Sequence, residues 1–367
     1  MPLGDVLSKV LELQSNYTPN PKSALMKQRK DLVEHLIPDL IRSELAVSWP
    51  AWNASGSGGK GAPAEVPWSR YFDPVRSPAP TDGWYVVYLF DARGESVYLS
   101  LNQGTTTWDV ERQDFTFRPA AQLAQRVEWA RKVLVDTNAG PQTFRGIDLK
   151  GKQRLGRVYQ FGNVHGIEYR AAAMPSDAEL RDDLLQFGQL LDHLYKAEDE
   201  TLYIPGDEPP EIADAQLAAD QAAGKTRRPR KGGQGFRLNQ AEKKAIELHA
   251  VALATVHFEA LGYKVKDTGA VESYDLLATR PGEAIYVEVK GTASPGDQIV
   301  VTRAEVEHHL KHYPDNALVV VHSILLDRTS GAPVAYGGTP VVTQPWKIDE
   351  TALTPISFRY RIPPVVS

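Results

Sequence analysis

The sequence predicts two domains, an α+β domain followed by an α/β domain in which helices flank a mixed sheet. Its 367 residues are enough for two or three hydrophobic cores. Helical and strand patterns alternate on both sides of residues 206–237, where acidic, alanine-rich sequence turns basic and lacks large apolar side chains. Such a composition is typical of a flexible linker. We therefore expect domains at residues 1–205 and 238–367, joined by a linker at 206–237.

Capping and turn residues mark several elements of the first domain. Ser23 stands where a helix that begins at the next residue needs an N-cap. Asp91-Ala92-Arg93-Gly94 suits a hairpin turn between two apolar strands. The predicted helices are 6–13, 23–45, 120–135 and 176–197, and the predicted strands are 84–90, 96–101 and the strand-like region 157–169.

The order of elements in the second domain favours a sheet with a buried centre. A helix lies between apolar strands, as in mixed sheets whose faces are covered. The sequence from residue 331 onward is proline-rich and is expected to form short edge strands or loops. The predicted helices are 239–261 and 303–312, and the predicted strands are 263–266, 274–278, 284–290, 298–301 and 317–325.

The composition is typical of a soluble protein, with 42% hydrophobic and 24% charged residues. The lack of cysteine excludes disulfides and thiolate zinc sites. No apolar run approaches the roughly 20 residues that span a bilayer, and the N-terminus has no signal-peptide pattern. We expect a cytoplasmic protein without a membrane partner.

The net charge of −5 argues weakly against nucleic-acid binding. Phosphate contacts need only a local basic face, however, and residues 225–231 form a basic cluster. The members expected to contact a DNA backbone are Arg227, Arg228, Arg230 and Lys231.

Acidic residues interrupt two short apolar runs of the second domain. Asp275 lies in one run, and Glu288 and Lys290 lie in the next. The period of a strand places Glu288 and Lys290 on the same face, where Asp275 of the neighbouring strand can meet them. Two carboxylates and an ammonium at a sheet edge can hold a divalent metal and position a water. This arrangement is typical of phosphodiester cleavage.

Residues 239–325 resemble the PD-(D/E)XK nuclease superfamily, in which Glu-x-Lys follows an Asp at about this distance. The closest similarity is to the DUF3883 branch, carried by the segments 262–265, 274–276, 287–292 and 301–305.

The resemblance gives each of these residues a role. Asp275, Glu288 and the backbone carbonyl of Val289 would bind Mg²⁺ or Mn²⁺. Lys290 would orient the attacking water or stabilise charge on phosphorus, and Glu247 would add an acid from the preceding helix. The alternative is a structural arrangement of strand charges in which Lys290 pairs with the two carboxylates.

A glycine-rich segment at 56–61 and an aromatic strand at 83–90 stand out in the first domain. With Val66-Pro67-Trp68 and residues 98–104, they resemble the DNA-binding N-terminal domain of McrB-type restriction proteins, DUF3578. The resemblance covers about residues 25–169. It implies that modified cytosine, such as 5-methylcytosine, is recognised in double-stranded DNA by base flipping into an aromatic pocket.

The residue types suit such a pocket. Flipping a base costs a few kcal/mol, and stacking on an aromatic ring returns roughly 1–3 kcal/mol. Trp68 is the expected stacking residue, and Tyr85 and Leu89 face the same side of a strand. Ser57 and Lys60 are expected to contact phosphates, because the glycines around them expose backbone N–H groups.

These patterns also admit other interpretations. The aromatic residues can instead form a domain core, which is what we expect of Trp49 and Trp52. Residues 146–153 nearly match a phosphate-binding loop, but Gln153 replaces the Ser/Thr that would bind Mg²⁺, so no nucleotide cofactor is expected. The helix at 303–312 carries three histidines and is expected to face solvent or DNA.

Together these features predict a modification-dependent (type IV) restriction protein, in which a tethered nuclease domain acts near the modified base. Cutting both strands requires two active sites, so we expect a homodimer or two proteins on one DNA. The alternative is a methylated-DNA-binding protein whose nuclease-like domain is inactive.

Overall fold

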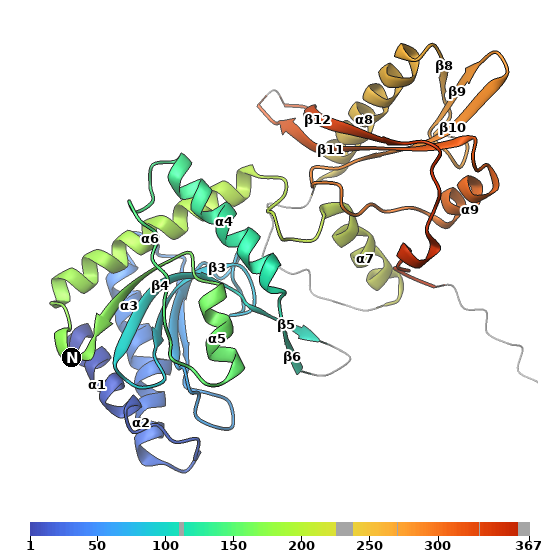
Figure 1. Cartoon of the computed structure of the whole chain (residues 1–367). Coiled ribbons are helices and arrows are strands. Elements are labelled where there is room, and N and C mark those ends of the chain that lie inside the picture. Colours follow the sequence, from blue (N-terminus) through green and yellow to red (C-terminus); the bar gives the residue numbers. More distant parts are fainter. Residues whose placement is uncertain (110–113, 225–237, 270, 330, 359–367) are drawn as a thin grey trace, which may run out of the picture. The chain divides into compact units, whose positions relative to one another are not determined.

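The computed structural model describes residues 1–109, 114–224, 238–269, 271–329 and 331–358. The described part divides into two compact units, unit 1 at Met1–Asp207 and unit 2 beginning at Glu208 (Figure 1). Each unit combines helices with a five-stranded sheet. The prediction of mixed α and β structure in both halves of the chain is therefore confirmed.

The sheet of unit 1 is antiparallel throughout and has the order β1–β2–β3–β4–β7. The turn between β3 and β4 is the predicted one, and the buried carboxylate of Asp91 accepts the N–H groups of Arg93, Glu95 and Ser96. Strands β5 and β6 form a separate hairpin. The bounds are β1 Asn53–Ser57, β2 Trp68–Phe72, β3 Trp84–Phe90, β4 Ser96–Gln103, β5 Thr106–Asp109, β6 Asp114–Phe117 and β7 His165–Arg170.

Alternate side chains of each strand enter two different cores. Trp84 and Tyr88 of β3 pack into the main core, which the sheet shares with α1, α3, α4 and α6 (Figure 1). Val87 and Leu89 point to the opposite face, into a smaller core with Leu149. The helices of unit 1 are α1 Leu3–Gln14, α2 Ala24–Asp31, α3 Ile37–Leu45, α4 Ala120–Asp136, α5 Arg154–Phe161 and α6 Asp177–Glu200, with a π-helical turn at Leu32–Leu36 between α2 and α3.

Several predictions for unit 1 are confirmed, and one is wrong. Ser23 caps α2, since its hydroxyl accepts the Met26 N–H at 3.4 Å. Trp49 and Trp52 stack on each other with ring centroids 5.0 Å apart and pack against the main core. The strand-like region 157–169 instead begins with α5, because its β-favouring residues pack as a short helix that ends before Gly162.

Unit 2 contains a mixed sheet of order β12–β11–β10–β9–β8. Strands β10 and β11 are parallel and are linked through α9, whereas the other pairs are antiparallel. Ile246, Ala254 and Phe258 of α8 fill the core against the sheet. The elements are α7 Pro210–Ala222, α8 Gln240–Ala260, β8 Lys264–Asp267, β9 Leu276–Arg280, β10 Glu283–Gly291, α9 Arg303–Lys311, β11 Asn316–Asp327 and β12 Val334–Thr343.

Unit 2 differs from the sequence prediction at two places and agrees with it at a third. Residues 298–301 form no strand and lead instead to Thr302, which caps α9. The first half of the expected linker is helical, because α7 buries Ile212 and pairs Asp214 with Lys243 of α8 at 2.7 Å. The proline-rich tail contributes β12, an edge strand that tolerates Pro340 because its outer N–H groups need no partner. In the described residues, no helix is long and apolar enough to cross a membrane.

A substitution at Gly56 tests how closely β1 packs against the π-helical turn. A Cβ at Gly56 would lie 1.9 Å from the carbonyl oxygen of Val33, so the two backbones must separate to admit it. We expect Gly56→Ala to destabilise unit 1 by about 1–3 kcal/mol, measured by thermal unfolding. Gly146→Ala is the control, since nothing lies within 4 Å of its added Cβ. Equal midpoints for the two variants would contradict this close approach.

Candidate functional site

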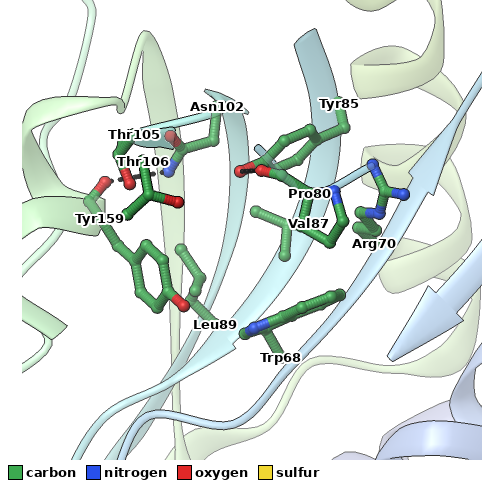
Figure 2. A pocket seen from close by; sticks show the side chains of 10 residues that line it. All are labelled: Trp68, Arg70, Pro80, Tyr85, Val87, Leu89, Asn102, Thr105, Thr106 and Tyr159. Atoms are coloured by element: carbon green, nitrogen blue, oxygen red, sulfur yellow. Dashed lines mark hydrogen bonds between the residues drawn. The ribbon is translucent and has the colours of Figure 1, made fainter. Parts of the chain in front are cut away.

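A pocket opens on the face of the unit 1 sheet that lies opposite the main helical core (Figure 2). Its volume is about 40 Å³, room for about three waters. The three residues expected to form a pocket, Trp68, Tyr85 and Leu89, all line it. The full lining is Trp68, Arg70, Pro80, Tyr85, Val87, Leu89, Asn102, Thr105, Thr106 and Tyr159.

Strand register explains why these side chains meet. Trp68 of β2 lies opposite Leu89 of β3, and Tyr85 of β3 lies opposite Asn102 of β4. Side chains two residues apart share a face of the sheet, so each strand contributes a row of contacts to the same surface. Tyr159 of α5 closes the pocket from outside the sheet.

The pocket has a buried floor and a partly exposed rim. Val87 and Leu89 are 3% and 2% exposed, whereas Trp68 and Tyr159 are half-buried. Burial raises the pKa of Tyr159 to about 12, and the neighbouring Trp68 indole opposes the shift. The phenol is therefore a neutral hydrogen-bonding group at ordinary pH.

Polar groups on the floor are held by the backbone. The Tyr85 hydroxyl lies 2.9 Å from the carbonyl oxygen of Gln103. The Asn102 amide donates to the carbonyl oxygen of Tyr159 at 3.1 Å, and its own oxygen accepts the Gln103 N–H at 2.8 Å. Asn102 thereby ties α5 to the sheet and fixes the position of the rim.

Arg70 is the charged residue of the floor and is 2% exposed. Its Nε donates to Ser55 Oγ at 3.3 Å, and its Nη1 donates to the carbonyl oxygen and hydroxyl of Ser77 at 3.1 and 2.9 Å. The guanidinium carbon lies 3.6 Å from the centre of the Phe72 ring. Burial lowers the pKa of Arg70 to about 10, and Asp82 opposes this shift without forming an ion pair with it.

The glycine-rich segment begins beside the rim, because Ser57 pairs with Trp68 in the β1–β2 register. Lys60 is exposed, as a phosphate contact requires. Two backbone N–H groups of the segment are already used: Gly58 donates to the Glu34 carboxylate at 2.8 Å, and Gly59 donates to Ser57 Oγ at 3.3 Å. These two N–H groups are therefore not available to a phosphate in this conformation.

Unit 2 brings the predicted acidic residues together. Glu288 is 1% exposed, and its Oε1 lies 2.6 Å from the Nζ of Lys290. The same Nζ donates to Glu305 of α9 at 3.0 Å. The other oxygen of Glu288 lies 3.5 Å from Nε2 of His309, which is fully buried. The expectation that the histidine helix faces solvent or DNA is wrong for His309.

Asp275 lies just before β9 and is oriented by the backbone of the next strand. Its Oδ2 accepts the Val289 N–H at 2.8 Å, while its Oδ1 accepts no hydrogen bond from the described residues. Burial, followed by repulsion from Glu288, raises the pKa of Asp275 to about 6. For Lys290, burial alone would lower the pKa, but Glu288 and Glu305 raise it overall. The lysine therefore stays charged between two carboxylates.

The remaining predicted residues lie elsewhere. Glu247 is exposed on α8 and pairs with Lys244 at 2.7 Å, and no contact joins it to Asp275 or Glu288. Lys244 itself is close enough for Asp275 to help raise its pKa, after Glu247 and Asp267. Across the described ranges, no group of three or more His, Cys, Asp or Glu side chains is placed to hold a metal ion. The basic residues Arg227, Arg228, Arg230 and Lys231 lie outside the described residues.

Two residues of the candidate sites, Arg70 and Glu305, were not predicted although the sequence contains patterns that place them there. Arg70 is two residues from Trp68, so the strand period places it on the pocket face. Glu305 stands three residues after Thr302, and this capping box fixes the start of α9 next to Lys290. Tyr159 had no such signal, because its contact with the sheet depends on the packing of α5.

Comparison with known families adds to this geometry. Residues 12–196, just over half of the chain, match the family model described as MrcB-like, N-terminal domain. The chain belongs to this MrcB-like family. Residues 241–332 match the model described as Protein NO VEIN, C-terminal. No curated protein and no solved structure gave a match.

Both candidate sites fall inside the matched ranges. The pocket residues, from Trp68 to Tyr159, belong to the MrcB-like domain. Asp275, Glu288 and Lys290 belong to the NO VEIN-type domain. The chain thus joins a MrcB-like N-terminal domain to a NO VEIN-type C-terminal domain, each with its own cluster of polar residues.

The raised pKa of Asp275 predicts a pH-dependent stability. An unfolded Asp has a pKa near 3.9, and in the folded protein it rises to about 6. The protonated carboxyl therefore favours folding below pH about 4, and this contribution is lost as the pH rises through about 6. Without divalent metal, Asp275→Asn should gain thermal stability over the wild type as pH rises from 4 to 7. A difference in melting temperature between Asp275→Asn and the wild type that stays the same from pH 4 to 7 would contradict a raised pKa for Asp275.

Proposed function

We propose that the chain is a modification-dependent DNA restriction protein. Its MrcB-like domain would hold a flipped cytosine of the 5-methylcytosine type, and its NO VEIN-type domain would cleave the phosphodiester backbone. The observation that carries the proposal is the pocket, where Trp68, Tyr85 and Leu89 meet Tyr159 around one opening.

The pocket suits a flat, partly apolar ligand. A base that stacks on Trp68 gains roughly 1–3 kcal/mol, which offsets the few kcal/mol of unstacking. Val87 and Leu89 supply a small apolar floor where a C5 methyl group can rest. A whole base exceeds the present volume, so entry requires the rim side chains of Trp68 and Tyr159 to separate. The rim then acts as a gate that opens for a base already out of the stack.

The surroundings of the rim suit a DNA backbone. Ser57 is the last residue of β1 and lies opposite Trp68, and Lys60 follows it in the glycine-rich segment. Arg154 and Arg157 are exposed on α5, the same short helix that carries Tyr159. Cations placed on two sides of an opening can hold the phosphates that flank a flipped nucleotide. These contacts would position the DNA without reading its sequence.

The acidic cluster suits a divalent metal in unit 2. Oε2 of the buried Glu288 and Oδ1 of Asp275 accept no hydrogen bond from the described residues. Hard oxygen ligands of this kind fit Mg²⁺ or Mn²⁺, with the Val289 carbonyl as a further ligand. Such a metal would supply charge stabilisation at phosphorus and lower the pKa of a bound water. Lys290, which two carboxylates hold in place, would orient that water.

A second candidate function is a reader of modified DNA that does not cut. The ion pairs of Lys290 favour it, because a lysine between Glu288 and Glu305 forms a closed structural network. In this case the second domain would contact DNA or a partner. The experiments below separate the two functions.

The reader function depends on Trp68. We expect full-length protein to bind DNA amplified with 5-methyl-dCTP more tightly than the same DNA made with ordinary dCTP. Trp68→Ala should remove most of this preference, about tenfold or more, because the stacking surface is lost. Trp68→Phe keeps a ring and is expected to retain part of it. If fluorescence anisotropy shows that Trp68→Ala leaves the preference unchanged, the pocket assignment is wrong.

The nuclease function depends on Glu288. We expect Mg²⁺ or Mn²⁺ to allow cleavage of methylated DNA and to raise the melting temperature of the wild type, because binding stabilises the folded state. Glu288→Gln should abolish both effects while methylated-DNA binding persists. Glu307→Gln is the control, since Glu307 is exposed on α9 and pairs only with Arg303 in the described structure. Selective binding without cleavage or a metal-dependent shift would favour the second candidate.

A further inference from the structure

Arg70 gives the pocket a feature that a methyl group does not need. It is a buried cation on the floor of a cavity, and no carboxylate of the described residues forms an ion pair with it. We propose that the pocket accepts a cytosine whose C5 substituent carries an anionic oxygen, with 5-carboxylcytosine as the chemical type, and that Arg70 binds this substituent. The proposal rests on the proposed reader function and specifies its substrate.

The donors of Arg70 are only partly used. Nε and Nη1 are occupied by Ser55 and Ser77, while Nη2 donates to no group in the described part of the chain. Nη2 also keeps some exposure, and Arg70 is one of the residues that line the pocket. Two N–H groups are therefore available for an oxygen ligand.

The spacing of the pocket fits a base with a substituent. Trp68 and Arg70 are two residues apart on β2, so their side chains rise from the same face about 7 Å apart. This is close to the width of a pyrimidine ring with a group at C5. A ring stacked on Trp68 can direct that group towards Arg70, which lies opposite Val87. The apolar floor then contacts the ring, and the guanidinium contacts the substituent.

The energetics favour an anion over a methyl group. Burial makes an unpaired guanidinium costly, and the Phe72 and Tyr85 rings at 3.6 and 5.5 Å compensate for only part of the lost hydration. A carboxylate would supply the missing counter-charge through charge-assisted hydrogen bonds. A methyl group would leave Nη2 without a partner once the ligand had displaced water from the pocket.

Two other roles for Arg70 make different predictions. As a structural residue, it would anchor the loop at Ser77, and its loss would lower stability without changing preference among modified bases. As a contact to a backbone phosphate, it would strengthen binding to every DNA alike. Preference among C5 substituents is therefore the quantity to measure.

The test uses full-length protein and DNA fragments of one sequence, amplified with ordinary, 5-methyl- or 5-carboxyl-dCTP so that every sequence context is present. Binding is measured without divalent metal by competition between pairs of fragments. We expect the wild type to prefer the 5-carboxyl fragment over the 5-methyl fragment by about tenfold or more. Arg70→Gln should lose this preference, so that it binds the 5-carboxyl fragment no more tightly than the 5-methyl fragment. Arg70→Lys keeps the charge and should retain a weaker preference for the carboxyl fragment.

The outcomes separate this inference from the proposed function. If the wild type prefers 5-methyl to both other fragments, Arg70 does not read an anionic substituent, while the reader function stands. If no fragment is preferred, the reader function itself fails. If Arg70→Gln weakens binding to all three fragments equally, Arg70 contacts a phosphate or supports the fold, and the inference is overturned. Should Arg70→Gln fail to fold in a thermal melt, the wild-type preference and Arg70→Lys decide.

Discussion

The alternation of side chains across the antiparallel sheet of unit 1 is the constraint on which the pocket depends. Every second residue of β3 is committed to the main helical core, including Trp84 and Tyr88. The intervening residues face the other side, where α5 and loop residues such as Leu149 and Pro80 cover them. A shift of one residue in register would send the pocket side chains into the core. The strong main core therefore fixes the position of the weakly covered face, and the ligand site benefits from a rigid floor.

In unit 2 the same principle places the acidic cluster. Glu288 and Lys290 share a face because they are two residues apart on β10, and the parallel pairing of β10 with β11 brings α9 over that face. The capping box of α9 orients Glu305 towards the lysine. The cluster is thus made by secondary-structure geometry before any ligand contributes, and the buried Glu288 is held by its ion pair with Lys290.

The sequence predicted what short-range periodicity determines. The bounds of β3 and the grouping of Trp68, Tyr85 and Leu89 follow from spacing within one or two strands, and the cap at Ser23 follows from its residue type just before a helix. It could not predict that 157–161 would be helical, because the same β-favouring residues pack well in either state and tertiary contacts decide. Glu247 and His309 show the same limit: which face of a helix meets the sheet depends on packing, so the exposed acid and the buried histidine could not be told apart from spacing alone.

Unit 1 buries a positive charge at its candidate site, and unit 2 brings negative charges together at its own. Neither arrangement is explained by a gain in folding stability. The pocket of unit 1 buries a guanidinium that forms no ion pair with the carboxylates of the described residues, and in unit 2 burial and the nearby Glu288 raise the pKa of Asp275 to about 6. Replacing such groups by apolar side chains of similar volume is often neutral or stabilising in folded proteins. Local arrangements that oppose stability concentrate at functional sites, where a ligand supplies the missing charge. An anionic ligand would do so for Arg70 and a divalent cation for the two carboxylates. The inferred anionic substituent and the proposed metal site are therefore supported by separate electrostatic arguments, and either one can fail without the other.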